Sequence, residues 1–246
     1  MIGLGQGIVS SAGNVMRPSP FELQVLLDGK VDASFITTDF PLLTGDLITW
    51  EDQKNNFDAA QSVSASRPTV GTVFGEQGAE FDVADDFMTI PFFYDWTNLP
   101  FTLLIVATRL ASTEFKGIIT NRNSSGSGAW FTMAQQDTSN MRVERTGGNI
   151  ALNFNFDAKS QPPQIYEYNH NPTAGRDQVY RNGTLESDVA TLSNIGDVTK
   201  ILRIGTHSFN IRSWDGFIHQ VEVWTGLFSS AFRASRNTEL NLKWQQ

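Results

Sequence analysis

The sequence predicts an all-β fold: a two-sheet antiparallel jelly-roll sandwich with a short C-terminal helix and an extended N-terminal arm. A chain of 246 residues suits one large β-sandwich or barrel and is too short for two ordinary domains and a linker. Short apolar runs are separated by breaks rich in Gly and Asn, and no long segment keeps the 3.6-residue apolar period of an amphipathic helix. We therefore expect residues 1–22 to form the arm and residues 23–246 the sandwich.

Two strand-like runs organise the last third of the chain. They are Ile201–Ile204 and Phe217–Trp224, and a polar loop ending in Asp215-Gly216 separates them. The end of the second run alternates apolar and polar residues, as a half-buried strand does, and Asp-Gly supplies the backbone freedom for a return strand. We expect the two runs to pair as a hairpin.

A tight turn precedes this pair and a helix follows it. Asn182-Gly183 is the dipeptide that best suits the positive φ angles of a two-residue type I′ turn, and strand residues flank it on both sides. After the last strand, residues 227–240 predict a short helix capped by Ser229 or Ser230, with Phe232 turned inward.

These elements carry a resemblance to a known family. The order of tight hairpin, polar loop, R-I-G strand and D-G-x-I-x-x-V-x-V-W resembles the C-terminal half of laminin G-like domains, within the concanavalin A-like lectin/glucanase superfamily. The first part of the chain is similar to the opening of laminin G-like domains common in bacteriophage structural proteins and bacterial surface proteins. The matching segments there are Leu23–Asp28, W-E-D at Trp50–Asp52, A-A-Q at Ala59–Gln61, R-P-T at Arg67–Thr69 and a further hairpin at Gly78–Ile90.

The resemblance covers residues 23–246 and implies a concanavalin A-like sandwich. One departure is Lys54-Asn55-Asn56, where the family usually shows Gly-Asn-Gly. The family contains lectins, glycosidases, adhesion modules and virion parts, so the fold that it implies does not select a function.

The N-terminal 22 residues are rich in Gly and Pro and cannot hold a helix. They allow two interpretations, a frayed terminus or an arm that orders against a neighbouring subunit. Their apolar side chains favour the second as a hypothesis of assembly, and those we single out are Ile2, Leu4, Ile8 and Val9.

Charge and composition exclude several functions. The formal net charge is −8, with net −10 in residues 1–100 and net +2 in residues 101–246, so nucleic-acid phosphates would repel the chain. There is no Cys, no secretion signal at the N-terminus and no apolar run of membrane-spanning length, so we expect no thiol chemistry and no membrane insertion.

Catalytic and metal-binding signals are weak. Glycosidases of this superfamily place carboxylates on one strand as E-x-D-x-E, and this chain has no such triplet; Glu222 is followed two residues later by Trp224. We expect no enzyme activity. Asp82, Asp85 and Asp86 could offer oxygen ligands to Ca²⁺, but Asp is common in turns because it bonds its own backbone, so we expect no cofactor.

A glycan platform would need aromatic rings beside polar side chains. The candidates are Trp214, in a polar loop, and Trp130, Tyr168 and Trp96. Trp50, Trp224 and Trp244 occupy motif positions, and we expect them in the core.

Two functional hypotheses follow. The first is a bacteriophage virion protein: a capsid decoration, head-fibre or tail-associated subunit made in the host cytoplasm. Its partners would be other virion proteins or copies of itself, together with host-surface glycans. The second is a free-standing carbohydrate-binding module or bacterial surface lectin.

Overall fold

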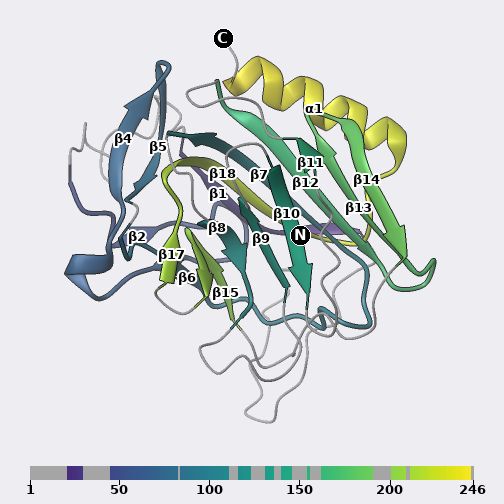
Figure 1. Cartoon of the computed structure of the whole chain (residues 1–246), viewed down its shortest axis with the longest axis horizontal. Coiled ribbons are helices and arrows are strands. Elements are labelled where there is room, and N and C mark those ends of the chain that lie inside the picture. Colours follow the sequence, from purple (N-terminus) through teal and green to yellow (C-terminus); the bar gives the residue numbers. More distant parts are fainter. Residues whose placement is uncertain are drawn as a thin grey trace, which may run out of the picture.

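The structure, a computed structural model, describes residues 21–29, 45–82, 84–110, 116–122, 131–135, 140–145, 154–155, 162–190, 201–208 and 211–244. The described residues form two eight-stranded sheets of antiparallel neighbours, a two-stranded ribbon and one C-terminal helix (Figure 1). The predicted all-β sandwich is confirmed. The arm residues Ile2, Leu4, Ile8 and Val9 lie outside the described residues, so their role stays a prediction.

One sheet, here sheet A, has the strand order β14-β13-β12-β7-β18-β5-β4, with β1 also pairing with β18. Its strands are β1 (Glu22–Asp28), β4 (Thr69–Val73), β5 (Glu76–Phe81), β7 (Phe101–Arg109), β12 (Gln164–Asn171), β13 (Arg176–Arg181), β14 (Thr184–Ala190) and β18 (Gly216–Thr225).

The other sheet, sheet B, has the order β11-β10-β9-β8-β15-β6-β3-β2. Its strands are β2 (Thr49–Trp50), β3 (Ala59–Ala60), β6 (Met88–Ile90), β8 (Lys116–Thr120), β9 (Phe131–Gln135), β10 (Asn140–Arg145), β11 (Phe154–Asn155) and β15 (Leu202–Ile204). The remaining elements are the ribbon β16 (Thr206–Ser208) and β17 (Ile211–Ser213), a 3-10 turn at Ser64–Ser66 and the helix α1 (Ser230–Trp244).

Strand β7 shows why the sandwich has three layers. Its side chains Leu103 and Ile105 enter the main core between the sheets, while Leu104 and Val106 belong to a second apolar cluster. That second cluster also contains Leu240 and Trp244 of α1, so the helix covers the outer face of sheet A. Burial on both faces explains why the sequence of β7 is continuously apolar instead of alternating.

Two local predictions are confirmed. Asn182 and Gly183 have φ angles of +48° and +78°, as a type I′ turn requires, and they join β13 to β14. Ser229 caps α1, because its Oγ accepts a hydrogen bond from the backbone N–H of Phe232 at 3.2 Å. The helix continues to Trp244, four residues beyond the predicted end, because its last turn packs against sheet A.

The predicted pairing of Ile201–Ile204 with Phe217–Trp224 is wrong. Strand β15 lies in sheet B between β8 and β6, whereas β18 lies in sheet A between β7 and β5. Gly78–Ile90 likewise crosses from β5 in sheet A to β6 in sheet B and does not form a hairpin. A turn signal marks where a chain reverses and does not say which sheet receives the next strand.

The W-E-D motif organises the turn after β2. Both carboxylate oxygens of Asp52 accept backbone N–H groups, from Leu26 and Lys54 at one oxygen and from Asn55 and Phe57 at the other, at 2.8 to 3.0 Å. The carboxylate therefore ties this turn to β1, which is a structural role. The helix within the described ranges is too short and too polar to cross a membrane.

Candidate functional site

The aromatic candidates for glycan binding lie in the core. The side chains of Trp96, Tyr168 and Trp214 have 0% exposure, and Trp96 packs edge-on against Phe101 with ring centroids 4.9 Å apart. A platform needs an open ring face, so the prediction that these three rings offer one is not supported by their placement. Trp130 lies outside the described residues.

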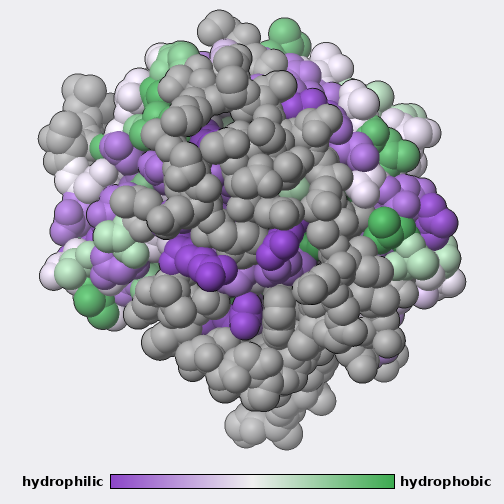
Figure 2. Space-filling view, viewed as in Figure 1, coloured by the Kyte–Doolittle hydropathy of each residue, from purple (hydrophilic) through white to green (hydrophobic). Residues whose placement is uncertain are grey.

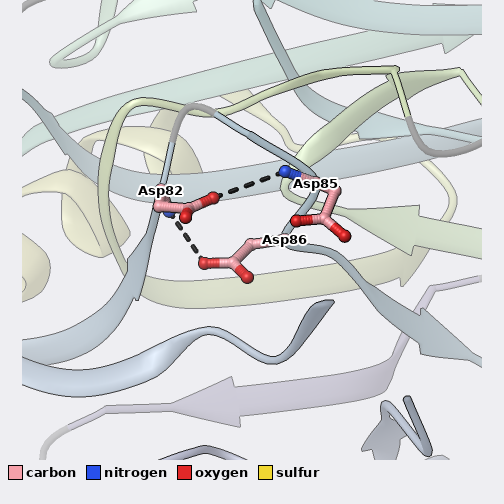
Figure 3. A group of neighbouring side chains, drawn as sticks. All are labelled: Asp82, Asp85 and Asp86. Carbon is pink, nitrogen blue, oxygen red and sulfur yellow. Dashed lines mark hydrogen bonds between the residues drawn. The ribbon is translucent and has the colours of Figure 1, made fainter. Parts of the chain in front are cut away.

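The acidic residues meet in the crossover from β5 to β6 (Figure 3). Ligand oxygens of Asp82, Asp85 and Asp86 all lie within 4.8 Å of one another. Asp86 accepts the backbone N–H of Asp82 at 2.8 Å, Asp82 accepts that of Ala84 at 2.9 Å, and Asp85 accepts the hydroxyl of Ser66 at 2.7 Å. The three carboxylates thus hold the turn together through bonds that Asp side chains commonly make in turns.

Burial is the main reason that the pKa of Asp86 is raised from 3.8 to about 7, and the charges of Asp82, Asp85 and Asp46 add to the shift. The backbone hydrogen bond from Asp82 acts in the opposite direction. A carboxyl group in this state is neutral over part of the physiological pH range. The cluster has the right ligand chemistry for Ca²⁺, but its internal hydrogen bonds already explain its geometry.

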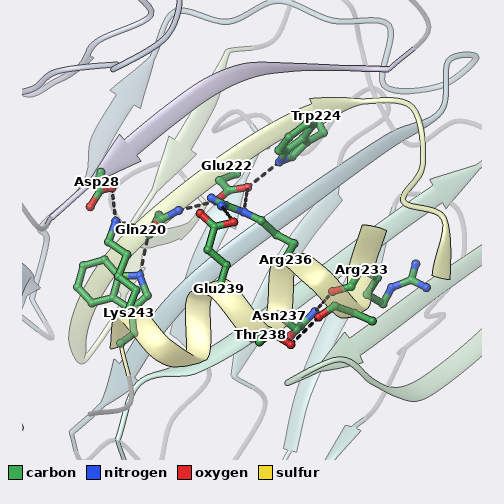
Figure 4. A network of polar contacts seen from close by, with 12 residues as sticks. Asp28, Gln220, Glu222, Trp224, Arg233, Arg236, Asn237, Thr238, Glu239 and Lys243 are labelled. Atoms are coloured by element: carbon green, nitrogen blue, oxygen red, sulfur yellow. Dashed lines mark hydrogen bonds and ion pairs between the residues drawn. The ribbon is translucent and has the colours of Figure 1, made fainter. Parts of the chain in front are cut away.

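Two buried glutamates on sheet A form ion pairs with arginines of α1. Figure 4 shows the first of them, Glu222, beneath the helix. Glu222 of β18 accepts hydrogen bonds from Arg236 and from the indole N–H of Trp224, the latter at 2.7 Å. Glu167 of β12 binds Arg233 through both oxygens, at 2.8 and 3.0 Å. These carboxylates lie beneath the helix, so neither is placed for chemistry on a polysaccharide.

The outer face of sheet B carries a different arrangement. Residues paired across antiparallel strands point to the same face, so the register places Arg203, Thr120, Thr132 and Glu144 in one row across β15, β8, β9 and β10. The neighbouring row points inward and is fully buried; it consists of Ile204, Ile119, Met133 and Val143. Sheet B therefore has an apolar inner face and a polar, charged outer face.

The ribbon β16–β17 lies on this outer face. A Cβ atom on Gly117 of β8 would come within 2.1 Å of the Cα of His207, so only glycine allows this approach. The backbone carbonyl of His207 accepts a hydrogen bond from the hydroxyl of Thr132 at 3.2 Å. The Nε2 atom of the His207 ring lies 2.8 Å from Oε2 of Glu144. The ribbon thereby brings Arg212 of β17 to the same side as Arg142 and Glu144.

Three arginines lie close enough to His207 to repel its charged form, and Arg203 contacts one of them, Arg122; we call this group the arginine face. Its members are Arg122, Arg142, Arg203 and Arg212, together with His207 and Glu144. Figure 2 shows strongly hydrophilic side chains in the middle of this side of the molecule, over the strands of sheet B. Arg203 donates to the carbonyl of Arg122 at 3.1 Å, and Arg142 pairs with Glu144.

Burial and neighbouring charges shift the pKa values of several groups on the arginine face. Burial, followed by the charge of Arg212, lowers the pKa of both Arg122 and Arg142. The pKa of His207 falls from 6.5 to about 3, first because the ring is buried and then because three neighbouring arginines repel its charged form. His207 is therefore neutral. Its Nε2 carries the proton and donates the hydrogen bond to Glu144, because a carboxylate can only accept one.

This arrangement can bind an anion. Guanidinium groups make charge-assisted, bidentate hydrogen bonds to planar carboxylates and to other oxyanions. Sequence reasoning missed the site because its arginines are far apart in the chain. The available signal was the alternation of Arg142 and Glu144 with the buried Met141 and Val143, which places both charges on the outer face.

Comparison with known proteins supports the fold and gives no family. No protein-family model matches the chain, and no curated protein matches it. The sialidase of Trypanosoma rangeli in complex with sialic acid matches 91% of this chain with a TM-score of 0.60 at 12% sequence identity. The match covers 34% of that sialidase, so the chain spans about a third of its length.

A second structure of that sialidase, with 2,3-difluorosialic acid as a covalent intermediate, gives a TM-score of 0.60 at 11% identity over the same 91% of this chain and 34% of that one. A CBM40 of a Ruminococcus gnavus IT-sialidase, bound to alpha2,3 sialyllactose, gives a TM-score of 0.48 at 12% identity, covering 56% of this chain and 83% of that one. At these identities the sialidase match shows a shared sandwich fold alone.

Proposed function

We propose that this chain is a glycan-binding sandwich domain that recognises its ligand without hydrolysing it. The observation that carries the proposal is the arginine face: a polar, charged sheet surface supported by an apolar inner row. Polar side chains on a rigid sheet are suited to sugar recognition, because the strands fix the geometry of their hydrogen bonds. The fold shared with a sialidase solved with sialic acid is compatible with this function.

The carboxylates argue for recognition instead of hydrolysis. Glycoside hydrolysis generally uses two carboxyl groups that flank the scissile bond, about 5 to 9.5 Å apart. Glu222 and Glu167 are held beneath α1 by arginines. On the arginine face, the carboxylate of Glu144 is engaged by Arg142 and His207.

The test is binding and turnover on the same samples. The full chain is applied to a glycan microarray, hits are measured by calorimetry, and reducing-end release is assayed on each polysaccharide that binds. We expect saturable binding to at least one glycan class and no release. Two results would overturn the proposal: a folded chain that binds no glycan, or release of reducing ends that Glu144→Gln abolishes.

A second proposal is that the domain serves as a bacteriophage virion subunit. The observation that favours it is the turn organised by Asp52, since W-E-D is one of the segments similar to the phage-type opening and its carboxylate ties β1 to the turn after β2. Mass spectrometry of purified particles from the source tests this role. Stoichiometric copies in the particle support it, and absence from purified particles contradicts it.

A further inference from the structure

We infer that the buried pair of His170 and Asp177 is a pH-dependent catch, which holds the crossover of residues 91–100 against sheet A and releases it as the pH rises above neutrality. The crossover connects β6 of sheet B to β7 of sheet A. His170 lies on β12, Asp177 lies directly opposite it on β13, and each side chain is 1% exposed. The pair is therefore placed to link the crossover to the strands of sheet A.

Both ring nitrogens of His170 face hydrogen-bond acceptors. Nδ1 lies 2.8 Å from Oδ1 of Asp177, and Nε2 lies 3.2 Å from the backbone carbonyl oxygen of Thr97 in the crossover. Neither a carbonyl nor an ionised carboxylate has a proton to donate. Both contacts are hydrogen bonds when each ring nitrogen carries a proton, and an imidazole binds this extra proton more tightly than a carboxylate does. The geometry thus describes an imidazolium paired with a carboxylate.

The described groups around this imidazole favour its charged form. From β12, the hydroxyl of Tyr168 donates to the same oxygen of Asp177 at 3.3 Å. From β7, the ring of Phe101 packs against the imidazole with centroids 5.3 Å apart. The crossover contributes the carbonyl of Thr97 and the carboxylate of Asp95, which accepts the backbone N–H of Thr97 at 3.2 Å. Burial disfavours a charge, whereas the neighbouring carboxylate and two hydrogen bonds to the charged form act in the opposite direction.

The other two histidines have different surroundings. Nδ1 of His219 lies 2.9 Å from the carbonyl of Gln77, but Nε2 faces the hydroxyl of Thr108 at 2.9 Å, and a hydroxyl can donate as well as accept. One ring proton is therefore enough to form both hydrogen bonds of His219. His207 is neutral, because its pKa falls to about 3. His170 differs from His219 because neither of its two acceptors has a proton to give.

Rising pH should weaken the catch. In an unfolded chain a histidine ring loses its second proton near about pH 6.5. Because the folded protein retains this proton, the pair contributes stability that is fully present below about pH 6.5 and is lost as the folded ring releases the proton. A neutral ring leaves one nitrogen lone pair facing an acceptor. Strand pairing fixes Asp177 opposite His170, so we expect the contact with Thr97 in the crossover to open.

The first measurement is the protonation of each histidine ring in the full chain, by two-bond ¹H–¹⁵N NMR at about pH 7.5, where an ordinary ring is mostly neutral. We expect both ring nitrogens of His170 to carry protons and the rings of His207 and His219 to be neutral. In Asp177→Asn the ring of His170 should be neutral at this pH, because the amide of Asn can donate to Nδ1. A neutral His170 ring in the wild type would overturn the inference.

The second measurement is the thermal midpoint of wild type and of His170→Gln between about pH 6 and pH 9. Gln keeps an amide that donates and accepts hydrogen bonds but does not titrate, so the difference between the two proteins isolates the ring of His170. The advantage of wild type over the variant should fall by at least about 4 °C over this range. The control is His219→Gln, whose difference from wild type should stay constant with pH.

Hydrogen–deuterium exchange of the peptide that spans residues 91–100 tests the hold on the crossover directly. At about pH 6.5 the peptide should exchange about tenfold more slowly in wild type than in His170→Gln, and at about pH 9 the two proteins should exchange alike. Equal exchange at both pH values, or a midpoint difference that is constant with pH, would overturn the inference. Should His170→Gln fail to fold, the protonation of His170 in the wild-type chain decides.

Discussion

The buried contact between Glu222 and Arg236 makes the strongest stability prediction. Glu222 has a side-chain exposure of 0% and Arg236 of 14%, and the pair joins α1 to sheet A (Figure 4). Burial acts to lower the pKa of Arg236, but the Glu222 carboxylate offsets that effect and raises the pKa overall. Removing one partner of a buried pair costs about 3–5 kcal/mol, because the other charge stays buried without compensation.

We expect Arg236→Ala to lower the free energy of unfolding by about 3 kcal/mol, the lower end of that range. The reason is that Gln220 and Trp224 continue to donate hydrogen bonds to Glu222. Glu222→Gln should cost less, about 1–2 kcal/mol, because Arg236 keeps its pair with the exposed Glu239. The double variant should cost less than the sum of the two, since the residues act as a unit.

Urea unfolding followed by tryptophan fluorescence measures these changes. The control is Arg176→Ala, which breaks a pair with Asp188 at side-chain exposures of 48% and 27% and should cost between 0 and about 1 kcal/mol. A loss for Arg236→Ala no larger than that of the control would refute the reasoning, because the contact would then behave as a solvent-exposed pair.

Three further predictions concern other parts of the chain. Trp224→Ala removes a half-buried ring that stacks on Phe21 at 5.4 Å, and should lower the free energy of unfolding by about 3 kcal/mol; a loss below about 1 kcal/mol would contradict it. Asp86→Asn should be more stable than wild type at neutral pH, and the difference in thermal midpoint should grow between about pH 4 and pH 7 and then level off. The reason is that the raised pKa of about 7 makes the wild type lose stability as the pH rises through this range, whereas Asn does not titrate. The corresponding gain in the free energy of unfolding is at most about 4 kcal/mol, and solvent at the exposed Asp82 reduces it. A difference in thermal midpoint that is constant at every pH would contradict this prediction. A chain beginning at Phe21 should keep its thermal midpoint and lose incorporation into particles; normal incorporation would exclude residues 1–20 as the assembly element.

The sequence was informative wherever the chemistry is local. The apolar run of β7, the Asn182-Gly183 turn and the Ser229 cap each depend on residues close together in the chain. Such features follow from backbone sterics and from hydrogen bonds over a few residues. They were predicted correctly because no distant partner is needed to define them.

Predictions about which elements pair with β18 or cover it were wrong. The polar side chains Gln220 and Glu222 alternate with Val221 and Val223, which predicted one face in solvent. In the structure both faces of β18 are buried, because α1 returns over sheet A and supplies Arg236 to the polar side. The alternating pattern shows that the two faces of β18 differ in polarity, but it does not show whether solvent or another element covers the polar face.

The two outer faces of the sandwich lead to opposite conclusions about function. On sheet A, cations of α1 pair with acids of the sheet: Arg236 meets Glu222, Arg233 meets Glu167 and Lys243 meets Asp28. These ion pairs hold the helix over the sheet, so the helix covers the acids that it binds. On sheet B, the ribbon β16–β17 adds Arg212, which is exposed and has a φ of +63°, to the charged outer face. Side chains covered by α1 cannot meet a ligand, so we propose that the outer face of sheet B is the surface on which glycan binding should be tested.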